Sequence, residues 1–462
     1  MKPKQFSSEN GQVLVILVMV MVGLLAFTAL AIDGGLIWAD RRGSQNAGDA
    51  AVLAGGFRIA NTLEDYQKGY NINYLNWDCA AIAPVMEIGE LEAAQQAAAN
   101  GYPITTTAKL VTTIYTNCEN GEDFGLYVDK YVDTTAEFTS QVDTSFLHFA
   151  YGGVVKNTIQ AISRVRPRMP LAFGFAIYAF GDGCGTGANP GGIFFNGGGG
   201  GGSVYVDGNG VLSNTCLQGN GSVDIIVCED PIDPDNPVCN NYADIGYGSS
   251  YGCSGAGCSI SPWPPTEQPE PLPSWALLFS EPKCDDAFPG TSYVSGPTNG
   301  GTIYPGKYSG ITVNGNDALV MMPGLYCFNG SFNATGGSIT ADGVTIYMED
   351  GNISIGGNVD PAVFSAPTYV VDPEDGVKGM LIYMAESNDG SISLAGNSNS
   401  TYTGVIFAAN PDSTVDISGT ADAVFNTQLI AGAVTVGGNA KITVNFNEGL
   451  VYHLPARLTL EK

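Results

Sequence analysis

Basic residues and histidine are scarce in this 462-residue chain. It has 18 Lys and Arg against 45 Asp and Glu, and only two His, so its formal net charge at pH 7 is −27. Such a chain repels phosphate backbones, and we expect no nucleic acid among its partners. A Ser-His-Asp mechanism would need His148, inside an aromatic run, or His453, near the C-terminus, and neither has a nucleophile motif nearby.

The sequence also lacks phosphate-binding and zinc-binding patterns. No glycine run precedes a Lys-Ser or Lys-Thr pair, and no C-x2-C pair occurs among the ten cysteines. All ten cysteines follow the first apolar segment, which predicts disulfides in an oxidising, extracytoplasmic compartment. Cys253 and Cys258 bracket a short glycine loop, and Cys284 and Cys327 flank another segment. These are the predicted pairs, and the remaining connectivity stays open.

Two acidic segments could in principle hold a metal ion. Residues 416–420 (DISGT) resemble the D-x-S-x-S/T metal motif of von Willebrand A domains, but the segment coincides with a repeated turn outside any strand–helix alternation. Four carboxylates are also close together, but prolines interrupt them and the spacing is not that of an EF-hand: Glu229, Asp230, Asp233 and Asp235. We predict no metal, no cofactor and no catalytic residues.

An uncharged apolar run occupies residues 13–32, close to the N-terminus. At about 1.5 Å per residue a helix of this length spans roughly 30 Å, the thickness of the hydrocarbon core of a bilayer. The run therefore predicts a transmembrane helix. The predicted anchor residues are Val13, Leu14, Ile16, Leu17, Leu24, Leu25 and Ile32.

A cleaved signal peptide is the alternative interpretation of this run. Lys2 and Lys4 would form its basic region, and residues 29–31 (ALA) read as a cleavage site. The run is longer than the usual apolar region of about 7–15 residues, and apolar residues resume before Arg41 and Arg42. Flanking charge does not fix the orientation. The cysteines favour a cytoplasmic N-terminus and an extracytoplasmic C-terminal bulk.

The first 170 residues predict an anchored α+β unit. We expect a cytoplasmic tail over residues 1–12, the membrane helix over 13–32, a helical extension over 33–60 and an α+β unit over 61–170. Glycine pairs at 34–35 and 55–56 are the expected weak points of the helix. A second helix is expected over 87–100. Strands are expected over residues 105–115, 126–131 and 151–165, which are rich in β-branched and aromatic residues.

Residues 171–462 predict an all-β domain built from repeats. An apolar strand runs into a small Gly- or Asn-containing turn five times, starting at Val313, Ile355, Leu394, Ile417 and Val436. The starts are 42, 39, 23 and 19 residues apart, close to multiples of about 20, as expected for coils of a β-solenoid (β-helix-like fold). A β-sandwich with many Gly-Asn turns remains an alternative. A proline- and cysteine-rich insertion is expected over 228–285.

The N-terminal motifs resemble a known family. In order, the chain shows G-Q, the apolar run, D-G-G, R-R and Q-N-A-x-D-A-A, and this order resembles the N-terminal domain of TadE/TadG-like Flp pilus-assembly proteins. The motif residues are Gly11, Gln12, Asp33, Gly34, Gly35, Arg41, Arg42, Gln45, Asn46, Ala47, Asp49, Ala50 and Ala51. Residues 323–327 (PGLYC) and the Gly-Asn turns resemble the glycine-rich β-helical extensions that some members carry.

The resemblance implies a single-pass protein of the cytoplasmic membrane that works with the machinery building tight-adherence pili. Ile16 stands where type IV prepilins carry glutamate, so a pilin role is not expected. We therefore expect a non-enzymatic structural or adhesion protein whose partners are the membrane, Tad pilus or envelope proteins and, through the exposed solenoid, carbohydrate. A polysaccharide-active β-helix enzyme and a surface-layer or filament subunit remain the alternatives.

Overall fold

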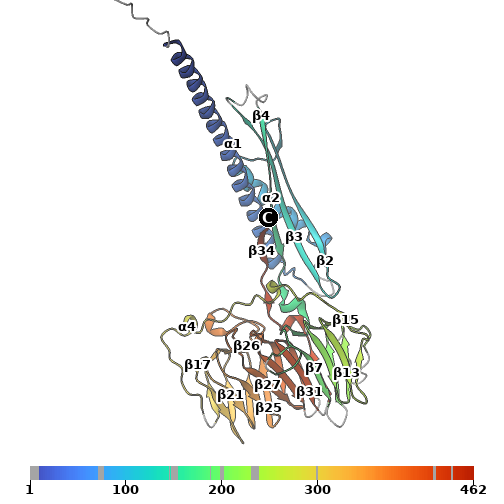
Figure 1. The fold of residues 1–462 in the computed structure, drawn as a ribbon. Helices are drawn as coiled ribbons and strands as arrows, with labels where there is room; N and C mark the ends of the chain where they lie inside the picture. Colours follow the sequence, from blue (N-terminus) through green and yellow to red (C-terminus); the bar gives the residue numbers. More distant parts are fainter. Residues whose placement is uncertain are drawn as a thin grey trace, which may run out of the picture.

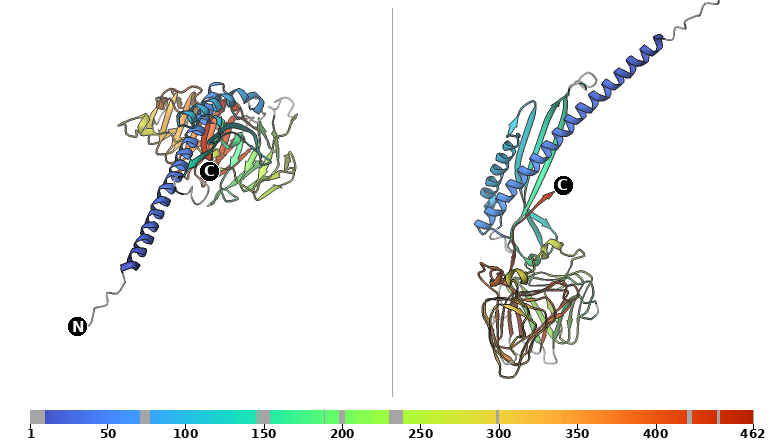
Figure 2. Two further views of the ribbon diagram at one scale, coloured as in Figure 1. Left: turned by 90° about the horizontal axis from the view of Figure 1, so that it is seen from above. Right: turned by 90° about the vertical axis from the view of Figure 1, so that its left-hand side faces the viewer.

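The computed structural model describes residues 10–70, 77–144, 146, 154–187, 189–197, 202–229, 239–297, 300–419, 423–438 and 441–461. The protein is elongated and has three parts (Figures 1 and 2). A long helix projects at one end, a helix-and-sheet unit that we call the stalk lies in the middle, and a β-solenoid lies at the other end. His148 and the acidic residues Asp230, Asp233 and Asp235 lie outside the described residues.

The N-terminal helix α1 (Asn10–Asp65) runs without interruption from the apolar run into the stalk. The expected weak points at Gly34–Gly35 and Gly55–Gly56 do not break it. At the second pair, glycine allows α1 to pack closely against the next helix, because a β-carbon on Gly55 would lie only 2.8 Å from the carbonyl oxygen of Gly89. Gly89 belongs to α2 (Cys79–Ala99), which starts earlier than expected, after the N-cap Asp78, and ends at Asn100.

The two helices cover one face of an antiparallel sheet. Its order is β1 (Thr105–Thr106), β2 (Leu110–Asp123), β3 (Val128–Asp143), β4 (Val154–Arg166) and β34 (Arg457–Glu461). Alternate side chains on the helix face form an apolar core with α1 and α2, whose members include Ala136, Phe138, Ile159 and Ala161. The other face is polar and includes the bidentate pair of Arg164 and Asp133, with both N···O distances 2.9 Å. This alternation is the pattern of a sheet with one solvated face.

The solenoid is a stack of coils with three parallel faces. The first face contains β16 (Gly301–Ile303), β19 (Ala318–Met321), β22 (Gly337–Ala341), β25 (Val359–Ser365), β32 (Lys441–Asn445), β8 (Gly202–Asp207), β11 (Val223–Cys228) and β14 (Ser259–Ser261). The second face contains β17 (Gly306–Tyr308), β20 (Gly324–Phe328), β23 (Val344–Met348), β26 (Met380–Met384), β6 (Ile177–Ala179), β9 (Val211–Ser213), β12 (Ile245–Tyr247) and β15 (Thr266–Glu267). The bent strands β28 (Thr401–Ala408) and β30 (Ala423–Ala431) belong to both faces.

The third face is the nine-stranded sheet. It contains β18 (Ile311–Val313), β21 (Phe332–Ala334), β24 (Ile353–Ile355), β27 (Ser391–Gly396), β29 (Thr414–Gly419), β31 (Ala433–Gly438), β7 (Gly192–Gly197), β10 (Cys216–Asn220) and β13 (Ser250–Ser254). All five repeated turns start within the last three residues of a strand of this face, at β18, β24, β27, β29 and β31. Each repeated turn therefore lies at the same corner of its coil, where the third face ends. The first interval of 42 residues spans two coils because β21 ends in a variant of the turn.

Side chains stack inside the coils. Phe364, Tyr402 and Phe425 come from successive coils, with neighbouring ring centroids 5.4 and 5.1 Å apart and nearly parallel planes. All three are buried. Such ladders of like residues fix the register of neighbouring coils, since a one-residue slip would turn each ring outward.

The chain enters the solenoid in the middle of the stack. β6, β7 and β8 pair with β9, β10 and β11 on one side and with β30, β31 and β32 on the other. The chain thus winds out to β15, crosses back along the described residues 268–297, restarts at β16 and winds back to meet its own beginning. The strands where the chain enters the solenoid and those where it leaves are consequently neighbours, close to the stalk.

The C-terminus returns to the stalk. β33 (His453–Leu454) pairs with β5 (Met169–Pro170), and β34 pairs antiparallel with β4. The solenoid is therefore inserted between two strands of the stalk sheet. This differs from the expected division, in which residues 171–462 form a single β domain, because five C-terminal residues complete a sheet that begins more than 300 residues earlier.

The predicted insertion over residues 228–285 also differs from the structure. Within it, β12 to β14 form a coil of the solenoid and β15 begins the next one. Parallel neighbours supply the hydrogen bonds that the proline-rich sequence lacks locally. The crossing segment is irregular and contains η2 (Ser274–Leu277) and the short helix α4 (Cys284–Ala287). The structure contains five disulfides: Cys79–Cys118, Cys184–Cys216, Cys228–Cys239, Cys253–Cys258 and Cys284–Cys327.

Candidate functional site

The apolar run of α1 is fully exposed in the protein. Its predicted anchor residues, from Val13 to Ile32, have no protein partner covering them, and this is the one membrane-span candidate among the described residues. An exposed stretch of twenty apolar residues is unfavourable in water and favourable in a bilayer. The helix thus provides a single-pass membrane anchor.

The acidic residues that follow the run attach α1 to the tips of the stalk strands. Asp33 is fully buried and accepts a hydrogen bond from the backbone amide of Phe146 at 2.8 Å. Asp40 accepts from the hydroxyl of Ser140 at 2.5 Å and from the amide of Asn157 at 2.9 Å. The stalk sheet therefore begins where the apolar run ends, which places it next to the membrane surface.

The Q-N-A-x-D-A-A motif packs α1 onto the sheet. Ala47 and Ala51 are buried in the stalk core, and a β-carbon on Gly48 would lie 2.9 Å from Ile159. Gln45 donates to Asp49 one turn later at 2.8 Å. Ala50 is half-buried, whereas five other motif residues are exposed: Gly34, Gly35, Arg41, Arg42 and Asn46. Side chains of Gly11 and Gln12 lie outside the description. The buried motif residues therefore hold α1 against the stalk.

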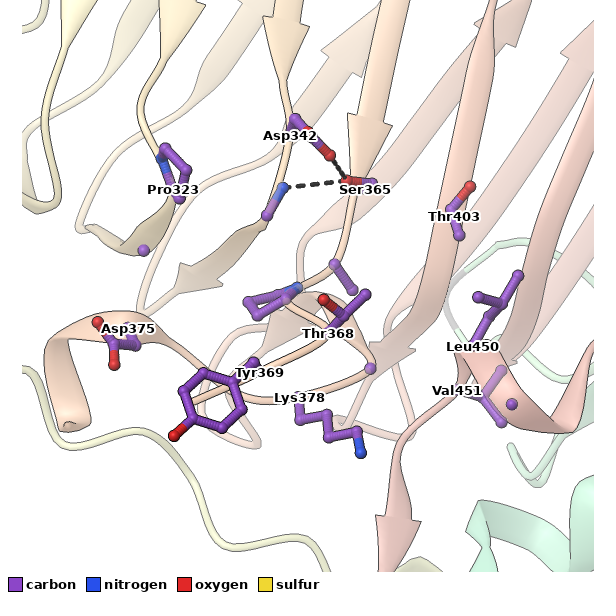
Figure 3. A pocket seen from close by; sticks show the side chains of 16 residues that line it. Pro323, Asp342, Ser365, Thr368, Tyr369, Asp375, Lys378, Thr403, Leu450 and Val451 are labelled. Atoms are coloured by element: carbon purple, nitrogen blue, oxygen red, sulfur yellow. Dashed lines mark hydrogen bonds between the residues drawn. The ribbon is translucent and has the colours of Figure 1, made fainter. Parts of the chain in front are cut away.

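A pocket of about 730 Å³ lies on the solenoid, where the first face turns into the second (Figure 3). Neighbouring coils make this turn in a few residues, but the coil between β25 and β26 carries a long loop over residues 366–379. This loop lies on one side of the pocket with Tyr369, Asp375 and Lys378 (Figure 3). Asp342, Ser365 and Thr403 line the pocket from the strand side. Its size fits a small ligand or one segment of a polymer.

Internal hydrogen bonds hold the pocket loop in place. The buried hydroxyl of Thr345 accepts from the amide of Val377 and donates to the carbonyl of Met380, both at 2.9 Å. Asp375 accepts from the amides of Asp372 and Val371 at 3.0 and 2.9 Å, and these hydrogen bonds lower the pKa of its carboxyl. Asp375 is thus an anion near neutral pH, suited to accept hydrogen bonds and unsuited to donate a proton.

Residues that the sequence singled out for chemistry do not converge on this pocket. His453 contacts the carbonyl of Val451 at 3.1 Å and Glu448 at 3.5 Å near the stalk. Asp416 is exposed on the third face, and Thr420 lies outside the described residues. No group of three potential metal ligands occurs within the described ranges.

Sequence reasoning missed the pocket residues. One signal could have located them: the interval of 39 residues between the turns at Ile355 and Leu394 is a single coil, β24 to β27, lengthened by the pocket loop. Insertions in one repeat of a solenoid often mark its binding face.

The comparisons with known proteins match only the N-terminal part. Residues 11–60 match the TadE/G-like Flp pilus-assembly family. No curated protein and no solved structure matches the chain. The matched residues include the apolar run of α1 and the Q-N-A-x-D-A-A motif that packs α1 onto the stalk sheet. Residues 11–60 are therefore a TadE/G-like domain, and this domain carries the membrane anchor.

Proposed function

We propose that this protein is a non-enzymatic structural and adhesion component of the Tad pilus system. The observation that carries the proposal is the TadE/G-like domain at residues 11–60, whose fully exposed apolar run leads directly into the stalk. In this proposal the N-terminus is cytoplasmic and the solenoid is extracytoplasmic. The five disulfides support that orientation because all of them follow the apolar run.

The shape supports a display role. About 33 residues of α1 follow the apolar run, which corresponds to roughly 50 Å of helix, and the stalk sheet stiffens this part. The solenoid is tied to the stalk by two strand pairings, β5 with β33 and β4 with β34. A rigid arm of this kind holds the solenoid away from the bilayer, where it contacts pilus or envelope components.

Fractionation and protease accessibility test the proposal in the native cells. We expect the full-length protein to stay in the membrane through alkaline extraction, and external protease on spheroplasts to remove the solenoid while leaving the N-terminal residues protected. Recovery of a soluble form that starts at Ile32 would contradict the anchor, since it would identify the run as a signal peptide.

In-cell crosslinking followed by affinity capture tests the Tad association. We expect the wild type to capture Tad pilus components. A Gly48→Leu variant should capture much less, because the leucine would push α1 away from Ile159 and Ala161 of the sheet. Gly35→Leu is the matched control, since nothing lies within 4 Å of a β-carbon at that position. Equal capture by both variants would argue against a role for the stalk in the association.

A further inference from the structure

Two ladders of outward side chains run along the first face of the solenoid. The first alternates valine and threonine over six successive coils: Val320, Thr340, Val363, Thr401, Val424 and Thr443. Each residue pairs with the next in the parallel register, and none is buried. We call this the Val-Thr ladder. It offers an apolar contact and a hydroxyl on alternate coils.

The second ladder is polar and lies two residues further along each strand. It consists of Asp342, Ser365, Thr403, Asn426 and Asn445. Ser365 donates to Asp342, and the amide of Asn445 donates to Asn426 at 3.0 Å. Asp342, Ser365 and Thr403 also line the pocket, so the polar ladder leads into it (Figure 3). The pocket and the ladders form one continuous surface.

The spacing of the Val-Thr ladder defines the geometry of a ligand. Parallel strands lie about 4.8 Å apart, so like residues of the ladder recur about every 10 Å. An extended β-1,4-linked glycan turns each ring over relative to the last, so its repeat is two sugars long, and we match this repeat to two strand spacings of the solenoid. Such a chain, lying along the solenoid axis, would present one ring face to every valine and the opposite ring face to every threonine, with its hydroxyls close to the threonines and the polar ladder.

Two further observations agree with a sugar ligand. Tyr369 at the pocket rim is 78% exposed on a loop pinned by Thr345, and an aromatic ring held in water is a platform for the apolar face of a sugar ring. The eleven ladder residues include one charged side chain, Asp342, and the pocket adds Asp375 and Lys378. The protein as a whole carries a net charge of −27. An acidic polymer would be repelled by this charge, and the ladders offer a basic polymer only one carboxylate, so we take the ligand to be uncharged.

We propose that the first face and its pocket bind an extended, neutral, β-1,4-linked polysaccharide chain, with Tyr369 stacking on one sugar and the two ladders contacting the sugars that follow. The proposal rests on the adhesion role proposed above and assigns its ligand. Binding involves no bond making or breaking, and Asp375 acts as a hydrogen-bond acceptor.

Titration calorimetry on the full-length protein in nanodiscs tests the proposal. The neutral probes are cellohexaose and chitohexaose, and the comparison probes are maltohexaose, whose chain curves, and hexagalacturonate, which is acidic. We expect at least one of the two neutral β-1,4 probes to bind, and both comparison probes to bind about tenfold more weakly or not at all. No binding of either β-1,4 probe at about 10 mM, or tighter binding of hexagalacturonate, would overturn the proposal.

Variants locate the site. We expect Tyr369→Ala and Val424→Glu each to weaken binding of the probe about tenfold, and Tyr369→Phe to retain it. Tyr115→Ala and Val154→Glu are controls at residues 40% and 51% exposed on the stalk strands β2 and β4, and should bind as the wild type does. Binding that survives both test variants would overturn the assignment of the surface. Membrane retention of the same preparations reports separately on the anchor, so failure of one proposal is distinguishable from failure of the other.

Discussion

Gly55 of α1 and Gly89 of α2 face one another across the stalk, and each lies within van der Waals contact of the backbone of the other helix. A β-carbon on Gly55 would meet the carbonyl oxygen of Gly89 at 2.8 Å, and one on Gly89 would meet that of Gly55 at 3.0 Å. This close approach brings α1 and α2 together on one face of the sheet, so the membrane anchor and the stalk form one unit.

Substitution of Gly55 by alanine should therefore destabilise the stalk. The added methyl group has to displace the backbone of α2 or the side chain of Ala93, which costs about 1–3 kcal/mol in the free energy of unfolding. Gly35→Ala is the control, because its β-carbon meets nothing within 4 Å and alanine favours the helix by about 1 kcal/mol. Urea unfolding in detergent measures both. A neutral Gly55→Ala variant would show that the helices separate easily.

Loss of the Cys284–Cys327 disulfide should loosen the end of the solenoid. This bond ties the crossing segment to β20, and the same segment covers the edge of β17 through a bridge between Val294 and Tyr308. It closes a separation of 43 residues, which corresponds to about 4 kcal/mol in the chain-entropy model. Replacing both cysteines by serine should lower the melting temperature, measured by calorimetry.

The Cys253–Cys258 disulfide provides the comparison for that experiment. It closes a separation of 5 residues, which corresponds to about 2 kcal/mol. The double serine variant at these positions should therefore lower the melting temperature less. An equal loss in the two variants would mean that chain closure does not explain the stabilisation.

The stability of the stalk should rise with pH around Lys130. This side chain is buried on β3, and its ammonium nitrogen lies 4.3 Å from the centre of the Tyr70 ring. Burial lowers the pKa of Lys130 to about 8. In the unfolded chain the pKa is near 10.5, so between about pH 8 and 10 the unfolded state binds more protons and stability increases with pH.

Lys130→Met removes this titration while keeping the volume of the side chain. The variant should be more stable than the wild type at pH 7, by about 1–3 kcal/mol, and its stability should not rise between pH 8 and 10. Chemical denaturation at a series of pH values measures this. A rise of equal size in the variant would assign the titration to another group.

Gln428 should be essential at the point where the chain enters the solenoid. Its buried side-chain amide donates to the carbonyls of Leu171 and Phe175 at 2.7 and 2.9 Å. Between them, Ala172 and Phe173 adopt positive φ angles of 49° and 53°, which are costly for residues with a β-carbon. The hydrogen bonds hold this turn in place.

Gln428→Leu leaves two buried carbonyls without a donor and should cost about 2–4 kcal/mol. Gln141→Leu on the stalk is the control and should change stability by less than about 0.5 kcal/mol, because that side chain is only half-buried. Thermal unfolding of the two variants compares them. Similar melting temperatures would show that water or another donor satisfies the carbonyls.

Local sequence patterns determined several features of this protein. The length of the uncharged run sets the membrane span, since a bilayer requires about twenty apolar residues. The recurring turn that starts at Ile355, Ile417 and Val436 predicts a solenoid because every coil must present the same corner in register. The distribution of the cysteines predicts disulfides and an oxidising compartment. Each of these properties depends on residues close together in the chain.

Only the tertiary structure decided where the stack begins and what its surface carries. The seam between β6 and β30 pairs Ile177 with Leu429, and β34 joins the stalk sheet next to β4. Coils of similar sequence can stack on one another in many orders, so no local pattern specifies which coil lies next to which. The pocket and the Val-Thr ladder exist for the same reason. Both bring together side chains from several coils, and their alignment depends on the register of the assembled sheet.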